Sequence, residues 1–159
     1  MIEDEKKSRR PLLAFMLVTL AVGALGSVVT TPAIPGWYAG LNHPAIAPPN
    51  WVFAPVWTTL YVMMAVAAWR AWKVAGTRSA AINMYGVQLA LNLLWSMFFF
   101  GLHRMDWAFA EIIVLILSIA VCTGLFWRAC RIAGLLMLPY LAWTIFAAWL
   151  NYSFLALNR

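Results

Sequence analysis

The residues best placed to do chemistry are polar and aromatic side chains that interrupt otherwise apolar segments. Gln88 and Asn92 are four positions apart and are followed by Trp95 and Ser96, so all four share one face of a helix. Carboxamides are costly in an apolar environment unless they meet partners, and this face is therefore expected to point inward. Two roles are open for it: a hydrogen-bond clamp between helices, or a wall of amides that orients a ligand in a cavity.

Two other segments present faces that could complete such a cavity. One has Pro139, Trp143, Ala147 and Asn151 at spacings of four, and Ala147 leaves room beside the Trp143 ring. A flat aromatic ligand would gain about 0.5–1.5 kcal/mol of stacking per ring pair in addition to burial. Ordinary packing inside a helical bundle is the alternative for each ring. The other segment carries Trp51 on one side and Phe53, Trp57 and Tyr61 on a neighbouring side.

Ionisable residues offer less chemistry. Glu111 is the one acid inside a long apolar segment, and we expect it to pair with Arg104 or His103 or to reach an interface, with a proton relay as the alternative. For His43 and His103 we expect surface or capping roles, with an axial haem ligand as the alternative. The sequence has no paired-carboxylate site, no GxSxG, no P-loop and no Cys–His–Asp set, and its two cysteines form no CxxC motif. No metal site is predicted.

The composition identifies the elements that must position these residues. Only 10% of the 159 residues are charged and 65% are hydrophobic, against roughly 25% and 45–50% in ordinary soluble domains. No charged residue occurs in 11–69, 79–103, 112–127 or 132–158. About 20 apolar residues in a helix cross the ~30 Å hydrocarbon core of a bilayer. We therefore predict an all-α membrane protein with one transmembrane domain over residues 1–159, a five-helix bundle whose spans are about 12–31, 51–72, 80–101, 107–127 and 134–155.

The segment between the first two spans is rich in proline and is predicted to be a loop over residues 32–50. Proline lacks the backbone N–H and clashes with the preceding turn, so a continuous helix is not expected here. Loops of this length are usually functional or disordered, and aromatic and apolar residues argue against disorder. We interpret it as a lid loop. Its prolines are Pro32, Pro35, Pro44, Pro48 and Pro49.

The basic residues predict an orientation. Nine Lys and Arg residues precede span one or lie between spans two and three and spans four and five, whereas only Arg104 and Arg159 belong to the other face. The positive-inside rule therefore places the N-terminus in the cytoplasm and the lid loop on the opposite side. The net charge of +6 is explained by these span ends, so nucleic acid is not an expected partner. The apolar run from Leu12 to about Thr31 is too long for a usual signal peptide, and we interpret it as a retained span.

Span one carries small residues at a spacing of four: Thr19, Gly23, Ser27 and Thr31. In lipid, such a stripe lets two helix backbones approach closely. The spacing leaves two interpretations open, packing within the chain or the seam of a homodimer.

Three segments resemble the TspO/MBR family, the tryptophan-rich sensory proteins related to the mitochondrial translocator protein. WYAGLNHPAIAPPNWVFAPVWTTLY (37–61) is similar to the family signature, and QLALNLLWSMFFFG (88–101) and PYLAWTIFAAWLNYSFLALN (139–158) agree in order and spacing. The resemblance covers the lid loop and spans two, three and five. It implies a five-helix bundle, usually dimeric, with a pocket beneath the loop that joins the first two helices.

The resemblance also implies ligands and site residues. Family ligands include porphyrins and other tetrapyrroles, isoquinoline and benzodiazepine-type drugs and, in eukaryotes, cholesterol. The loop departs from the family pattern, which often has Lys and Trp flanking the proline where this chain has His43 and Ile46, so one cation for a porphyrin propionate is missing. Together with Ala147, the residues expected to bind ligand are Trp37, Tyr38, Trp51, Phe53, Trp57, Gln88, Asn92, Trp95, Tyr140, Trp143, Phe146 and Asn151.

The expected function is therefore that of an integral membrane receptor or sensor for tetrapyrroles, such as a porphyrin or a haem-like molecule, or for similar flat apolar ligands. No cofactor is required beyond the tetrapyrrole as ligand. One alternative is light- or oxygen-dependent porphyrin degradation, in which Trp51 and Trp143 match the indoles implicated in some bacterial members. A transporter is the other alternative, but the sequence has no internal repeat and no coupling carboxylate pair. Sterol binding is not predicted, because six residues separate Tyr152 from Arg159.

Overall fold

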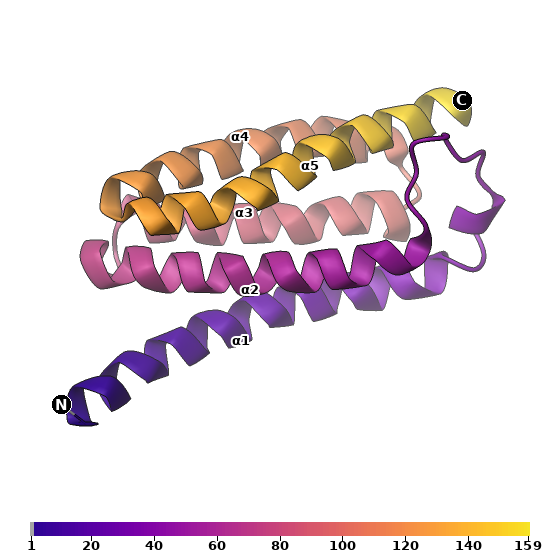
Figure 1. Cartoon of the computed structure of the whole chain (residues 1–159). Helices are drawn as coiled ribbons and strands as arrows, with labels where there is room; N and C mark the ends of the chain where they lie inside the picture. Colours follow the sequence, from indigo (N-terminus) through magenta and orange to yellow (C-terminus); the bar gives the residue numbers. More distant parts are fainter. Residues whose placement is uncertain (1) are drawn as a thin grey trace.

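The computed structural model describes the backbone of residues 2–159 and the side chains of residues 10–159. All five predicted spans are present as helices long and apolar enough to cross a membrane, and the protein is an integral, multi-pass membrane protein (Figure 1). The third span ends in one turn of π-helix, Met97–Gly101. The α-helices are α1 (Ile2–Ala33), α2 (Asn50–Ala75), α3 (Ala80–Ser96), α4 (Met105–Ala129) and α5 (Arg131–Leu157).

The first loop is shorter than the sequence predicts. Pro32 lies inside the last turn of α1, which ends at Ala33, so the loop covers residues 34–49 instead of 32–50. The missing N–H of Pro32 removes only one hydrogen bond this close to the end of a helix, and the helix can therefore absorb it. The other four prolines of the predicted loop lie outside the helices, and the last of them, Pro49, is the residue that precedes α2. We call residues 34–49 the α1–α2 loop.

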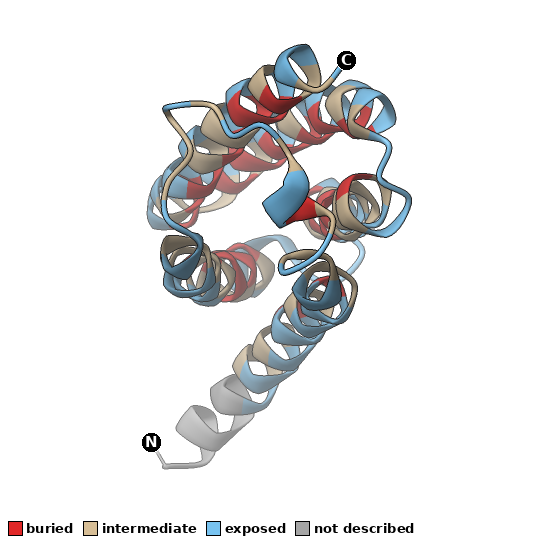
Figure 2. Cartoon of the chain, turned by 90° about the vertical axis from the view of Figure 1, so that its right-hand side faces the viewer, coloured by how far each residue is buried: buried red, intermediate tan, exposed pale blue. Residues whose placement is uncertain are grey.

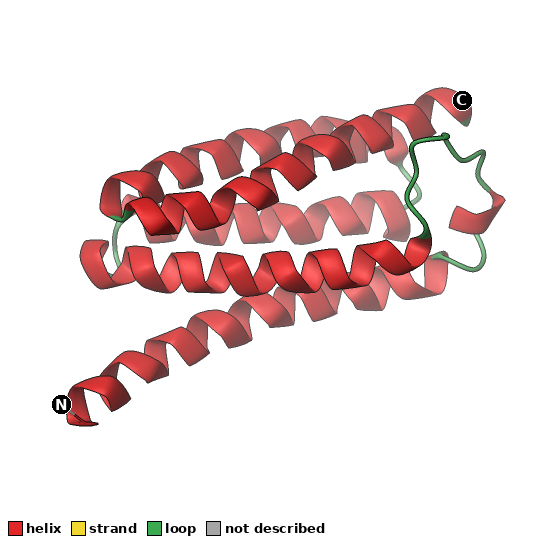
Figure 3. Ribbon diagram, viewed as in Figure 1, coloured by secondary structure: helices red, strands yellow, loops and turns green. Residues whose placement is uncertain are grey.

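The helices form an antiparallel bundle from which α1 diverges toward the N-terminus (Figure 1). The tightest packing joins α4 to α5, which only Cys130 connects, and α4 also packs on α3, while α1 packs mainly on α2. Figure 3 shows the α1–α2 loop, the α3–α4 connection and the C-terminus at one end of the bundle. The α2–α3 and α4–α5 connections lie at the other end, with Arg70, Lys73, Arg78, Arg128 and Arg131 in or near them. The cytoplasmic location of this end stays a prediction.

The core lies where the helices face one another. Viewed from the end that carries the α1–α2 loop, buried residues face the interior and exposed residues face outward (Figure 2). Small side chains on α2, such as the fully buried Ala67 and Ala71, allow close packing around larger residues such as Met64, Phe126 and Tyr140. A second, smaller core lies beneath the loop and consists of Tyr38, Phe99, Ala108, Leu150 and Phe154. Apolar residues also cover the outer surface, where a bilayer would solvate them.

Candidate functional site

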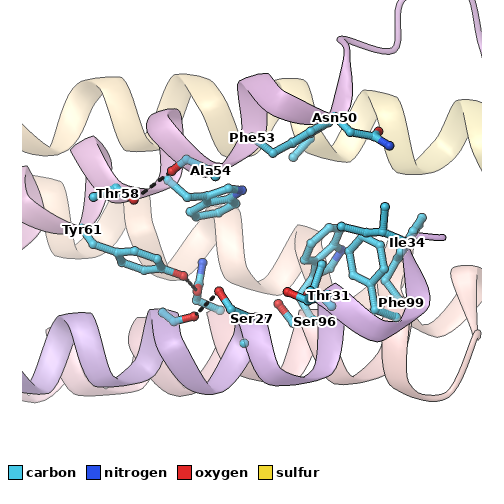
Figure 4. A pocket seen from close by; sticks show the side chains of 18 of the residues that line it. Ser27, Thr31, Ile34, Asn50, Phe53, Ala54, Thr58, Tyr61, Ser96 and Phe99 are labelled. Atoms are coloured by element: carbon cyan, nitrogen blue, oxygen red, sulfur yellow. Dashed lines mark hydrogen bonds between the residues drawn. The ribbon is translucent and has the colours of Figure 1, made fainter.

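A cavity of about 360 Å³ lies among α1, α2, α3 and α5, at the end of the bundle beneath the α1–α2 loop. Figure 4 shows α1 and α2 facing each other across it, with Ser27 and Thr31 on one side and Phe53 and Tyr61 on the other. Helix α1 and the start of the loop contribute Leu20, Gly23, Ala24, Gly26, Ser27, Thr30, Thr31, Ile34 and Tyr38. Helix α2 contributes Asn50, Phe53, Ala54, Trp57, Thr58 and Tyr61. The remaining lining residues are Asn92, Trp95, Ser96, Phe99, Phe100, Trp143, Ala147, Leu150, Asn151 and Phe154.

The structure brings most of the expected site residues together around this cavity. They come from the loop and from three helices, far apart in the sequence, as the spacing arguments require. Eight of the thirteen line the cavity: Tyr38, Phe53, Trp57, Asn92, Trp95, Trp143, Ala147 and Asn151.

The other five expected residues lie outside the lining, for different reasons. Trp51 is 74% exposed in the first turn of α2, on the outer surface of the bundle. Trp37 stacks on His103 with ring centroids 4.3 Å apart, which uses its ring to fix the loop. Phe146 packs behind the Trp143 ring. Tyr140 and Gln88 are fully buried between helices, so they can act on a ligand only through their neighbours.

Asn92 joins three helices at the wall of the cavity. Its Oδ1 accepts a hydrogen bond of 2.7 Å from the Tyr61 hydroxyl on α2, and its Nδ2 donates one of 3.1 Å to the Tyr140 hydroxyl on α5. Asn92 is thus an interhelical clamp that also forms part of the cavity wall, while its contact with a ligand stays a prediction. Because the clamp fixes Tyr61 at the cavity surface, it also sets the shape of the cavity.

A second polar chain closes the same wall nearer the loop. The indole N–H of Trp95 donates to Asn151 Oδ1 at 3.1 Å, and Asn151 Nδ2 donates to the backbone carbonyl of Met105 at 3.0 Å. These bonds fix the Trp95 ring, which stacks on Phe99 with centroids 5.3 Å apart. The π-helical turn that contains Phe99 directs two phenylalanine rings at the cavity, consistent with the frequent location of such turns at functional sites.

Two polar groups near the cavity have no partner within the described part of the chain. The indole Nε1 of Trp143 is buried and unpaired although its residue lines the cavity. Gln88 is fully buried with both side-chain polar atoms unpaired, but it does not line the cavity. Native proteins rarely leave such groups unsatisfied, and of these two residues only Trp143 reaches the cavity.

Glu111 differs from its expected role. Arg104 pairs instead with Asp106, with Nε to Oδ1 at 2.9 Å, because the two residues flank the start of α4. Glu111 is only 7% exposed, and neither carboxylate oxygen has a hydrogen-bond partner within residues 10–159.

Helix α1 supplies the wall that sequence reasoning missed. Gly23 is so close to Tyr61 that an added Cβ would lie 2.5 Å from Tyr61 Cε2, while Ser27 and Thr31 line the cavity. Thr19, the first member of the small-residue stripe, is buried and hydrogen-bonds to Tyr85 of α3. Thr19 and Gly23 thus pack within the chain, whereas Ser27 and Thr31 are exposed at the cavity. The combination of hydroxyls and a glycine in this stripe was the available signal for a cavity wall.

The α1–α2 loop is fastened to the C-terminus by paired asparagines. Asn42 N donates to Asn158 Oδ1 at 2.8 Å, and Asn158 Nδ2 donates back to Asn42 O at 3.1 Å. His43 Nε2 contacts the Tyr38 carbonyl at 3.1 Å. Tyr38 itself is 5% exposed, and this burial raises the pKa of its phenol. These contacts hold Tyr38 at the mouth of the cavity.

Asn158→Ala is expected to loosen this loop. It removes both bonds to the Asn42 backbone, each worth about 0.5–1.5 kcal/mol net, so amide exchange in residues 38–47 should accelerate roughly tenfold. Hydrogen exchange followed by mass spectrometry measures this. Asn83→Ala, at an exposed position of α3, is the control and should leave loop exchange unchanged. Equal exchange in the wild type and Asn158→Ala would show that the clamp does not restrain the loop.

Comparison with known proteins agrees with this architecture. The family model of the TspO/MBR family matches residues 15–157. A tryptophan-rich protein TspO of Archaeoglobus fulgidus is 36% identical over 92% of this chain and 96% of its own length. A tryptophan-rich sensory protein of Cereibacter sphaeroides is 40% identical over 91% and 92%, and the human translocator protein is 38% identical over 89% and 88%. With five membrane helices, four of which line an aromatic cavity, and this similarity along nearly its whole length, the chain belongs to the TspO/MBR family.

Proposed function

We propose that the protein is a membrane receptor or sensor that binds a tetrapyrrole or a similarly flat, apolar ligand in the cavity beneath the α1–α2 loop. The observation that carries the proposal is the buried, unpaired indole N–H of Trp143 in a wall of aromatic rings. A ligand with a hydrogen-bond acceptor would satisfy this donor while its faces stack on Trp57 and Trp95. The relatives named sensory protein and translocator protein support a ligand-responsive role.

The chemistry of the lining defines the ligand further. The residues that line the cavity include no Asp, Glu, Lys, Arg or His, so recognition depends on ring stacking, amides and hydroxyls. Any carboxylate of the ligand must therefore lie outside the cavity, since burying an unpaired charge is costly. Porphyrin propionates would then lie in a polar environment outside the cavity, where they do not need the lysine that the loop lacks.

The cavity has a side opening through which the apolar ring system of a ligand could extend. Ser27 of α1 and Ala54 and Thr58 of α2 line the cavity and are also exposed on the bundle surface, which places the opening between these two helices. The volume of about 360 Å³ lies near the lower end of the ~300–1,000 Å³ range of small-molecule sites. A tetrapyrrole would thus fill the cavity and extend between α1 and α2.

Trp143→Phe tests the proposal because it keeps a ring and removes the N–H. Loss of one hydrogen bond is expected to weaken protoporphyrin binding about three- to tenfold, corresponding to 0.5–1.5 kcal/mol. Quenching of tryptophan fluorescence in detergent-purified protein measures the affinity. Trp149→Phe is the matched control, since Trp149 lies on the same helix but is 58% exposed and outside the lining. Unchanged affinity in Trp143→Phe, or an equal loss in both variants, would contradict the proposal.

Porphyrin degradation by the two indoles finds less support. Trp143 lines the cavity, whereas Trp51 lies outside it with 74% of its surface exposed, so one ligand in the cavity would contact only Trp143. We therefore propose binding as the function of this site. Mass spectrometry of protoporphyrin after illumination with the wild type and with Trp51→Phe distinguishes binding from degradation. Degradation that uses both indoles should yield less product with Trp51→Phe than with the wild type.

A further inference from the structure

A second concave surface lies at the opposite end of the bundle from the ligand cavity. It has a volume of about 230 Å³ and is formed by the last turns of α2 and the α4–α5 connection. Its lining, which we call the basic groove, is Trp69, Arg70, Lys73, Val74 and Cys130. Neither the cavity nor its proposed ligand involves these residues.

The charge of the basic groove is not neutralised by the described part of the chain. Between residues 10 and 159 the sequence has two acids, Asp106 and Glu111. Asp106 pairs with Arg104 at the other end of the bundle, and Glu111 is buried in α4 without a partner. Arg70 and Lys73 thus present two positive charges in one concavity, and an anion of matching size is the chemistry they fit.

The backbone adds to this positive potential. Cys130 is the residue that precedes α5, and the first backbone N–H groups of a helix carry its positive dipole end. Hydrogen bonds from the backbone N–H of Ala133 and of Ile132, with a further one from Arg70, lower the pKa of the Cys130 thiol. The groove therefore combines a guanidinium and an ammonium near the positive dipole end of α5, a setting that favours a phosphate.

The position of the groove indicates which phosphate it meets. Lys73 Nζ lies 4.8 Å from the centre of the Trp69 ring, at the end of a membrane span, and Trp with Lys is typical of the headgroup layer. Val74, which also lines the groove, is 67% exposed and could contact an acyl chain. We propose that the basic groove binds the phosphate of an anionic phospholipid headgroup, with Arg70 and Lys73 as its ligands.

Native mass spectrometry of the full chain, released from nanodiscs of phosphatidylcholine mixed with phosphatidylglycerol, tests this inference. Wild type is expected to retain phosphatidylglycerol in preference to phosphatidylcholine. A direct hydrogen bond from a charged group to a phosphate contributes about tenfold or more in affinity, so Arg70→Gln with Lys73→Gln should lower this preference at least tenfold. The matched control is Arg78→Gln with Arg128→Gln, which removes two charges from the same end of the bundle but outside the groove. The control is expected to keep most of the preference.

Three results would overturn the inference. An equal loss in both double variants would show that general charge at the membrane surface attracts the lipid. No loss in Arg70→Gln with Lys73→Gln would show that the groove is not the site. Displacement of phosphatidylglycerol by inorganic phosphate at matched concentration would show that the groove binds soluble anions. Circular dichroism of each variant confirms that the helices are intact. Arg70→Lys, which keeps the charge, should retain phosphatidylglycerol as the wild type does.

Discussion

Asn92→Leu is expected to lower the free energy of unfolding by about 1–3 kcal/mol and to weaken ligand binding at the same time. Leu has a similar volume but offers no hydrogen bond, so the hydroxyls of Tyr61 and Tyr140 both lose their partner. Tyr140 is fully buried, so without Asn92 its hydroxyl would be desolvated and have no hydrogen bond to offset the cost. The loss is expected to be moderate in a membrane protein, because hydrogen bonds between its helices contribute about 0.6 kcal/mol on average and about 1.7 kcal/mol at most.

Unfolding of the variant by SDS titration in mixed micelles, followed by circular dichroism, measures the change. Asn83→Leu makes the same substitution at an exposed position of the same helix and should have little effect. The mechanism predicts a rescue as well: Tyr61→Phe with Tyr140→Phe, introduced into Asn92→Leu, removes the unsatisfied hydroxyls and should recover part of the lost stability. A triple variant no more stable than Asn92→Leu would show that the loss does not come from these hydroxyls.

The network also explains why polar side chains of the bundle interior lie at the cavity. A helix bundle in lipid gains little from burying apolar surface, so its interior needs close packing and hydrogen bonds to fix one arrangement. Asn92 and Asn151 provide those bonds, and both line the cavity. The residues that hold α2, α3 and α5 together thus also contribute polar groups to the cavity. If a ligand binds as proposed, its contacts with these residues would act directly on helix packing.

The architecture was predictable because charge is excluded from hydrocarbon. Each of the five predicted spans lies in a helix, with span ends within three residues of the prediction, although α1 itself begins ten residues earlier, at Ile2. The identities at 37–61, 88–101 and 139–158 indicated the family correctly. Spacing by four also brought Trp143, Ala147 and Asn151 to one surface, as expected for a helix. These arguments depend on composition and period, which do not require knowledge of tertiary contacts.

The individual contacts were less predictable, since an apolar helix gives no sign of which side faces lipid. Trp51 and Trp143 are both tryptophans that were expected at the site, yet of the two only Trp143 lines the cavity. Glu111 was expected to pair because isolated charge in a membrane is costly, but Asp106 lies closer to Arg104 in sequence and takes that partner. The contribution of α1 was missed because its small residues could equally serve a dimer, which stays a prediction.

Gly23→Ala is expected to damage the cavity although it adds a single methyl group. The new Cβ would lie 2.5 Å from Cε2 and 2.8 Å from Cδ2 of Tyr61, so either the ring or α1 must move. Movement of the ring stretches the bond from Tyr61 to Asn92, which fixes the cavity wall. Overpacking of this kind typically costs about 1–3 kcal/mol, and a tenfold or greater loss of protoporphyrin affinity should accompany it.

Gly26→Ala provides the control that isolates this contact. Gly26 lies on the same helix and also lines the cavity, but its added Cβ would meet Ser96 Oγ at 3.5 Å, an ordinary contact. Both variants gain the same helix propensity from alanine, about 1 kcal/mol, so the difference between them reports the clash with Tyr61 alone. Adding Tyr61→Leu to Gly23→Ala removes the ring and should restore packing of α1 without restoring the hydrogen bond to Asn92. If Gly23→Ala and Gly26→Ala bind protoporphyrin equally well, the close contact between α1 and Tyr61 does not shape the ligand site.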